Sequence, residues 1–274
     1  MSKSSTGSIQ LQQRDRALLR ALAESFRILD RVQISELFPM GSASRVKFRL
    51  KQLLDAGYLS ARPIFNEGGN MQYGYYLGPR AAEAFESIER GAVHKARLDA
   101  AHLSSSGLAH RMLVDSIHIQ FLTAQRRNPN YRLLTWVDQY SPEWETLRTY
   151  GLNVQADGYA EYILLLHFDN LHTFFLEADR GGERGHVLSA KIRAYAEFAA
   201  SGTYQKRFAA PPFRVLFVTT TPKRAEALAE LVVSSGAAEL FWITSWPQLQ
   251  QAGIFDPIWI RPGQPDLYSI IPRL

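Results

Sequence analysis

In the first third of the chain, apolar residues recur at helical spacing with polar residues between them. Three segments have apolar positions three or four residues apart, namely Arg14–Phe26, Arg31–Phe38 and about Ala43–Ala56. Ser42 or Ser44 can cap the start of the third segment. The pattern therefore predicts three short helices in succession.

The spacing then becomes typical of extended strands. Two β-rich runs, 58–64 and 72–77, flank a polar turn over 66–70. We expect Gly68 and Gly69 to form the tip of a hairpin, because glycine adopts positive φ without steric strain. Three helices followed by a β-hairpin is the element order of a winged helix, in which the third helix enters the major groove of DNA.

The third predicted helix is apolar on one side and basic on the other. Its apolar residues are Val46, Leu50, Leu53 and Leu54. The residues predicted to bind DNA are those on its polar side, together with one arginine of the hairpin: Ser44, Arg45, Lys47, Phe48, Arg49, Lys51, Gln52 and Arg62. Lys51 and Gln52 lie opposite the apolar stripe, so we expect them to contact base edges.

Charge is distributed unevenly along the chain. Residues 1–80 contain 12 Lys and Arg against 6 Asp and Glu, whereas residues 81–274 contain 19 against 20. The basic first third favours an anionic partner, and the helix order makes double-stranded DNA the expected one. The chain has no cysteine, which excludes disulfides and thiolate metal sites and fits a cytoplasmic protein. No run is apolar enough to predict a membrane span, so no membrane partner is expected.

Composition suggests four parts. Residues 1–10 are polar and predict a disordered arm, and residues 11–90 hold the winged-helix domain, ending in a helix from Gly78-Pro79 to about Arg90. Residues 91–107 predict a linker, and residues 108–274 form the second domain. The fold class predicted for the whole chain is α+β.

Helical and extended patterns alternate in the second domain. The expected order is one helix, three strands, a helix, a strand, a helix and a strand: Leu108–Arg127, Tyr131–Val137, Val154–Leu166, Thr173–Glu177, Val187–Ala200, Phe213–Thr219, Pro222–Ser234 and Glu239–Ile243. This order predicts a mixed sheet with helices on its faces. Residues 248–274 are rich in proline and glycine and predict an irregular tail.

Three acids accompany the central strands. Asp157 precedes the second strand, while Glu177 and Asp179 end the third and, being two residues apart, face the same side. The two strands are expected to pair through a tight turn at Asp169-Asn170, which would bring Asp157 beside the other acids. Such carboxylates suit a hard divalent cation, so Mg²⁺ or Mn²⁺ is the candidate cofactor.

Several motifs together resemble the bacterial replication-relaxation family. They are the N-terminal helices from Arg14 to Leu59, the run Phe175–Glu183, the helix with Lys191 and Tyr195, and the strand Val215–Thr220. Members of that family are associated with plasmids and integrative mobile elements. The resemblance implies a DNA-binding protein acting in replication, relaxation or transfer of such an element, with other element proteins as further partners. The oligomeric state stays open.

The second domain also resembles the restriction-endonuclease-like core. In that superfamily an acid opens the second strand, and an acid followed two residues later by lysine lies on the third. Asp157 and Glu177 match the two acids, whereas Asp179 stands where lysine is expected, and Lys191 could substitute from the following helix. The resemblance implies either a metal-dependent nuclease or nicking enzyme using Asp157, Glu177, Asp179 and Lys191, or a degenerate module without a cofactor. A winged-helix transcriptional regulator is a third alternative.

Overall fold

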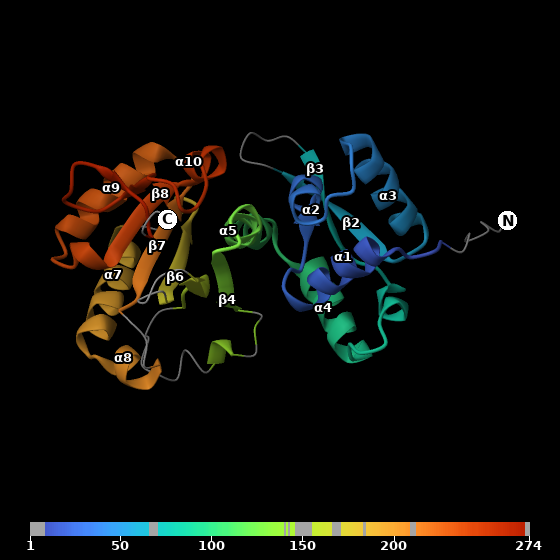
Figure 1. Ribbon diagram of the computed structural model, residues 1–274, viewed down its shortest axis with the longest axis horizontal. Helices are drawn as coiled ribbons and strands as arrows, with labels where there is room; N and C mark the ends of the chain where they lie inside the picture. The colour runs from blue at the N-terminus through green and yellow to red at the C-terminus, as the bar shows by residue number, and fades with distance from the viewer. Residues whose placement is uncertain are drawn as a thin grey trace. The chain divides into compact units, whose positions relative to one another are not determined.

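The chain divides into two units, Met1–Ile119 and Gln120–Leu274 (Figure 1). A computed structural model describes residues 9–65, 71–139, 141, 143–145, 155–165, 171–182, 185–208 and 212–271. Helices and strands are both present in each unit, which confirms the predicted α+β class.

Unit 1 begins with the predicted helices and hairpin strands. Its first elements are α1 (Gln13–Glu24), β1 (Leu29–Asp30), α2 (Arg31–Leu37), α3 (Ala43–Asp55), β2 (Leu59–Phe65) and β3 (Met71–Leu77). The described strands form an antiparallel sheet in the order β1-β3-β2, which confirms that β2 and β3 pair. The predicted turn over 66–70, including Gly68 and Gly69, lies outside the described residues.

Short polar motifs fix where the helices of unit 1 begin. The Asp30 side chain accepts a hydrogen bond of 2.8 Å from the Gln33 amide, and the Asp30 amide donates one of 2.9 Å to the Gln33 side-chain oxygen. This reciprocal capping box starts α2. Ser42 caps α3, and Gly57 follows its end with φ 78°. The centre of each helix's apolar stripe is fully buried, as Leu22 of α1, Ile34 of α2 and Leu50 of α3 show.

The segment after the hairpin differs from the sequence expectation. Instead of a helix from 79 to 90, a short 3₁₀ turn (Ala81–Ala84) ends at Phe85, whose backbone is extended. The residues assigned to a linker, 91–107, lie mostly in α4 (Arg90–His102) and at the start of α5 (Ser105–Arg127). α4 buries small side chains and packs against α1 and β3, so it belongs to unit 1.

Unit 2 is built on a mixed sheet. The strands described are β4 (Tyr131–Val137), β5 (Gly158–Leu164), β6 (Leu171–Asp179), β7 (Arg214–Thr219), β8 (Phe241–Ser245), β9 (Trp259–Ile260) and β10 (Leu267–Tyr268). They lie in the order β10-β9-β8-β7-β6-β5-β4, and β6 with β7 and β7 with β8 are the parallel pairs. The tail is therefore less irregular than predicted, because its two short strands β9 and β10 extend the sheet.

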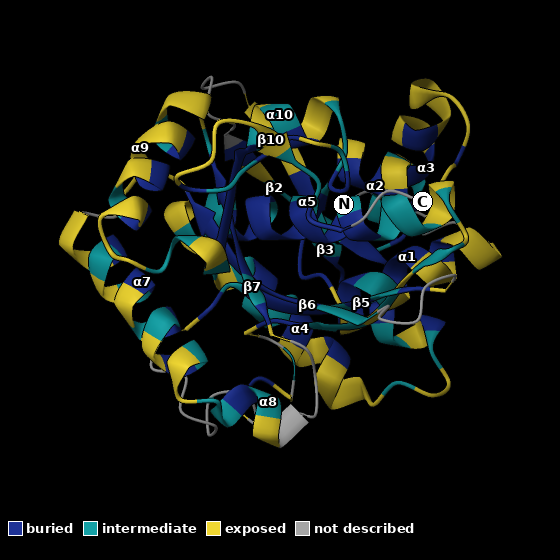
Figure 2. Ribbon diagram, turned by 60° about the vertical axis from the view of Figure 1, so that its left-hand side comes forward, coloured by how far each residue is buried: buried dark blue, intermediate teal, exposed yellow. Residues whose placement is uncertain are grey.

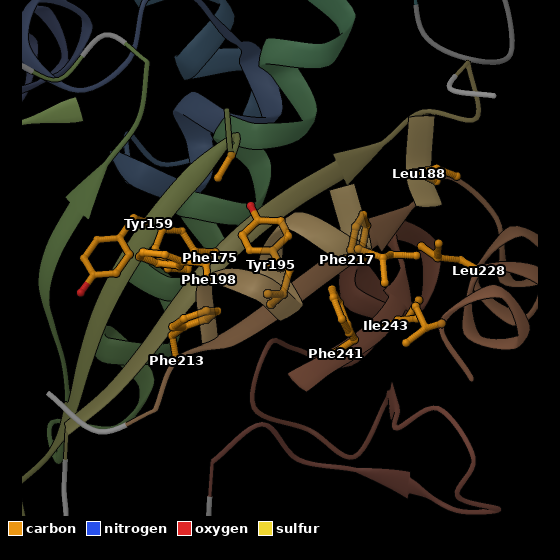
Figure 3. Packing of buried hydrophobic residues seen from close by; sticks show 14 of the residues in the cluster. Tyr159, Phe175, Leu188, Tyr195, Phe198, Phe213, Phe217, Leu228, Phe241 and Ile243 are labelled. Atoms are coloured by element: carbon orange, nitrogen blue, oxygen red, sulfur yellow. The ribbon is translucent and has the colours of Figure 1, made fainter. Parts of the chain in front are cut away.

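Helices cover the two faces of this sheet. α7 (Gly185–Ala200), α8 (Thr203–Phe208) and α9 (Pro222–Val233) pack on one face through an aromatic core, in which Phe175, Tyr195 and Phe213 lie close together (Figure 3). The last turns of α5 cover the other face, where Phe121 contacts the rings of Tyr162 and Phe174. Figure 2 shows that the strands are largely buried, while the outer sides of α7 and α9 are exposed.

Candidate functional site

The first candidate site is the outward side of α3. Val46, Leu50 and Leu53 face the core, so the amphipathic pattern that forms the helix also fixes which side meets solvent. Five of the residues predicted to bind DNA are exposed on that side: Ser44, Arg45, Lys47, Phe48 and Lys51. Gln52 is half-buried at its edge.

Arg49 has a place inside unit 1 that the sequence did not reveal. Its guanidinium forms a buried ion pair with Asp15 of α1, and it also bonds the Gln10 carbonyl at 3.0 Å and the Gln52 side chain at 2.9 Å. The hydrogen bonds that Arg49 donates to the Asp15 carboxylate raise the pKa of Arg49. Because Arg49 is 8% exposed, it ties α3 to α1 instead of presenting a charge to solvent.

Arg62 and Lys51 are also held by neighbours. The Arg62 guanidinium donates to the carbonyls of Ala100, Ala101 and Leu103 at 2.9–3.2 Å, and thereby caps the end of α4. Lys51 pairs with Asp55 one turn along α3 at 2.7 Å, but its side chain remains 70% exposed. Exposed pairs of this kind are weak, so the pair with Asp55 does not fix the position of the Lys51 ammonium group.

An open hollow lies beside the exposed side of α3. Its walls come from the start of α1, the turn before α3 and α3 itself: Gln12, Arg14, Met40, Ser44, Arg45, Phe48, Arg49 and Gln52. In the described part of the chain, Arg14, Arg45 and Lys47 pair with no carboxylate, so this side of unit 1 presents uncompensated positive charge.

The second candidate site is at the end of β6 in unit 2. Asp157 lies just before β5, where its backbone amide donates to the Leu176 carbonyl at 2.9 Å and its carboxylate accepts from the Ala178 amide at 2.8 Å. These bonds hold Asp157 beside Glu177, as the predicted strand pairing requires. The expected turn at Asp169-Asn170 lies outside the described residues.

Glu177 is buried under α7 and held from two sides. Lys191 donates to one carboxylate oxygen at 2.8 Å, and the Tyr195 hydroxyl donates to the other at 2.6 Å. Burial, and next the charge of Asp157, raise the pKa of Glu177 to about 7, while Lys191 opposes the shift. The structure therefore brings three of the predicted residues together: Asp157, Glu177 and Lys191.

Asp179 points to a different partner. Arg224 at the start of α9 donates to one of its oxygens at 2.7 Å, and the Gly181 amide donates to the other at 2.8 Å. Among the residues that the structure describes, no three His, Asp or Glu side chains are grouped to share a metal ion. Of the three acids predicted to bind a metal, Asp157 and Glu177 therefore lie side by side, and Asp179 has a separate partner.

The chain was compared with models of known protein families. The model of the replication-relaxation family matches residues 19–211, which is most of the chain. The chain belongs to the replication-relaxation family. No curated protein and no solved structure matches it. Membership supports a role in the replication or relaxation of plasmid or mobile-element DNA. No helix in the described ranges is both long and apolar enough to cross a membrane.

The matched range contains α3 and the acids of unit 2, but not every residue that pairs with them. It includes α3 and the acids with Lys191, and it ends before Arg224. Sequence reasoning missed Arg224, since it lies 45 residues from Asp179 and no local motif links the two. Tyr195 was recognisable only as the residue one helical turn after Lys191.

Proposed function

We propose that this replication-relaxation protein binds double-stranded DNA through α3 and acts in the replication, relaxation or transfer of a plasmid or mobile element. The observation that carries the proposal is the exposed basic side of α3, on a helix whose opposite side is anchored in the core of unit 1. The order α1-β1-α2-α3-β2-β3 is that of a winged helix, in which this helix enters the major groove.

The positions of the charges on α3 support this docking. On a helix with about 3.6 residues per turn, Ser44, Phe48 and Lys51 project from the middle of the exposed side. Arg45 lies on one flank and Lys47 on the other. A helix in the major groove has a phosphate backbone on each side, so a cation on each flank of α3 matches its surroundings.

The salt dependence of duplex binding tests the proposal. The Arg45→Ala/Lys47→Ala variant should bind a fluorescent duplex more weakly, and the slope of log K against log salt should fall by about 2, since each lost phosphate contact contributes about 0.9. The Arg90→Ala/Lys95→Ala variant is the matched control, because it removes two exposed cations from α4 of the same unit. Equal slopes for the two variants would refute docking through α3.

For unit 2 we propose a nuclease-like module without strong catalysis. Each carboxylate has a partner within the protein: the Ala178 amide for Asp157, Lys191 and Tyr195 for Glu177, and Arg224 for Asp179. A carboxylate that is neutralised by a neighbouring cation has less need of a metal. This support favours a domain retained for binding DNA or another element protein.

One observation favours the alternative, a metal-dependent nuclease or nicking enzyme. Lys191 reaches Glu177 beside Asp157, which assembles two acids and a lysine although the usual lysine position holds Asp179. A bound Mg²⁺ or Mn²⁺ would polarise phosphate and activate water. Calorimetry with Mn²⁺ separates the readings: micromolar binding that disappears in Asp157→Ala would favour the nuclease. Undetectable binding by the parent protein, together with no cleavage of supercoiled DNA, would favour the module without catalysis.

A further inference from the structure

Phe48 occupies an unusual position on the exposed side of α3. Its side chain is 64% exposed, the highest fraction among the large apolar residues that the structure describes. It lines the hollow together with Arg45 and Met40. Ser44 and Gln52 lie one turn before and one turn after it on the same side. An aromatic ring is therefore presented to solvent at the centre of a basic surface.

The surroundings of this ring fit a DNA groove better than a protein partner. The cores of protein–protein interfaces are depleted of charge. Around Phe48, by contrast, Arg45 and Lys47 flank the ring, and within the described ranges neither has a carboxylate partner. Charge complementarity therefore favours a binding partner that has a groove with negative charge along both edges and an apolar group at its base.

The major groove of duplex DNA has one such feature. The faces of stacked bases are covered in a duplex, so a side chain in the groove meets base edges only. The one apolar group on those edges is the methyl group at C5, which thymine carries and which methylated cytosine shares. Uracil and unmodified cytosine lack it.

We propose that Phe48 is a specificity-determining residue that contacts the C5 methyl group of a pyrimidine, with thymine as its usual source. This inference rests on the proposed binding of duplex DNA through α3. Arg45 and Lys47 hold the helix against the two backbones, and the ring at the centre adds affinity only where a methyl group is in reach. DNA preference then depends on where methyl groups lie, and not on hydrogen bonds alone.

Two duplexes that differ only in methyl groups test the inference. Both contain 24 alternating A·T and T·A pairs, and one has every thymine replaced by uracil. We expect the wild type to bind the thymine duplex about fourfold more tightly for each methyl group contacted, from the usual contribution of one buried methyl group. Phe48→Ala should bind both duplexes equally, and Phe48→Leu should retain part of the preference. Val233→Ala, which removes a 49% exposed apolar side chain in unit 2, should keep the full preference.

A second arm identifies the source of the methyl group. If any C5 methyl group suffices, the wild type should bind an alternating G·C duplex more tightly when its cytosines are 5-methylcytosine. If affinity rises only with thymine, the site is restricted to A·T pairs. Circular dichroism of each variant checks that the fold is retained.

The outcomes separate this inference from the function on which it rests. If neither duplex is bound, the DNA-binding proposal fails. If the wild type binds the thymine and uracil duplexes equally, or if Phe48→Ala keeps the preference, DNA binding stands and the role of Phe48 is wrong. If Phe48→Ala weakens binding to single-stranded oligothymidine more than binding to duplexes, Phe48 stacks on an unpaired base, and the inference is also overturned.

Discussion

Replacing Arg49 with methionine should destabilise unit 1 severely. The sequence pattern assigns Arg49 to the DNA-binding side of α3, but in the structure its side chain is buried. The side chain is 10% exposed and its partner Asp15 is 0% exposed. Methionine fills similar space but leaves the Asp15 carboxylate buried, and among the described residues its remaining hydrogen-bond donor is the Gln12 amide at 2.7 Å. Removing one member of a buried ion pair costs about 3–5 kcal/mol, because the remaining charge is left uncompensated.

The size of this loss predicts a large shift in unfolding. With a typical urea m-value of about 2 kcal/mol/M, the midpoint for unit 1 should fall by about 2 M. The Asp15→Leu/Arg49→Met variant removes both charges. It should recover most of the loss, apart from about 1 kcal/mol for the capping interaction at the start of α1.

The positions of the tryptophans make the assay specific to one unit. All 5 tryptophans follow residue 119, so their fluorescence reports unit 2, while far-ultraviolet circular dichroism reports both units. The midpoint by circular dichroism should fall in Arg49→Met and the fluorescence midpoint should stay constant. An unchanged circular dichroism midpoint, accompanied by a lower salt slope for DNA binding, would refute the structural role and return Arg49 to the DNA-contacting set.

Three further changes test single contacts. Burial raises the pKa of Glu177 to about 7 from its usual 4.5, so its contribution to folding is fully present below about pH 4.5 and is lost as pH rises through about 7. Fluorescence-monitored urea unfolding should therefore show wild-type stability falling relative to Glu177→Gln across that window, and a constant difference would contradict the shift. Arg62→Met removes the three bonds that cap α4 and should cost unit 1 about 1–3 kcal/mol by circular dichroism, with the exposed Lys95→Met as control. Arg224→Met should cost unit 2 about 1.5–3 kcal/mol by fluorescence, because Asp179 is 4% exposed, and an unaltered midpoint would show that the pair contributes nothing.

Local patterns predicted most elements of both units. The stripes of leucine in α1 and α3 are large and regular, and β4 was predicted at Tyr131–Val137, the bounds that it has in the structure. α4 was missed because its buried residues, Val93, Ala96 and Ala100, are small and give a weak apolar stripe between polar neighbours. β9 and β10 were missed because each is 2 residues long and is defined only by pairing across the sheet.

The candidate sites show the same division between local and long-range information. Helical spacing correctly indicates which side of α3 is polar, but it cannot tell that Arg49 pairs with Asp15, 34 residues earlier. Strand pairing brings Asp157 beside Glu177 as expected. The choice of Lys191 for Glu177 and Arg224 for Asp179 depends on how α7 and α9 cross the sheet, and no spacing in the sequence encodes that crossing.

Crosslinking from single cysteines tests most directly whether α3 meets the duplex. The chain has no cysteine, so Lys47→Cys and Lys95→Cys each provide one attachment point for a benzophenone maleimide. Both positions are exposed and lie on helices of unit 1, α3 and α4. We predict that irradiation of the protein with a labelled duplex gives a covalent product from position 47 and little from position 95. Equal products from both positions, or a product from position 95 alone, would contradict DNA binding through α3.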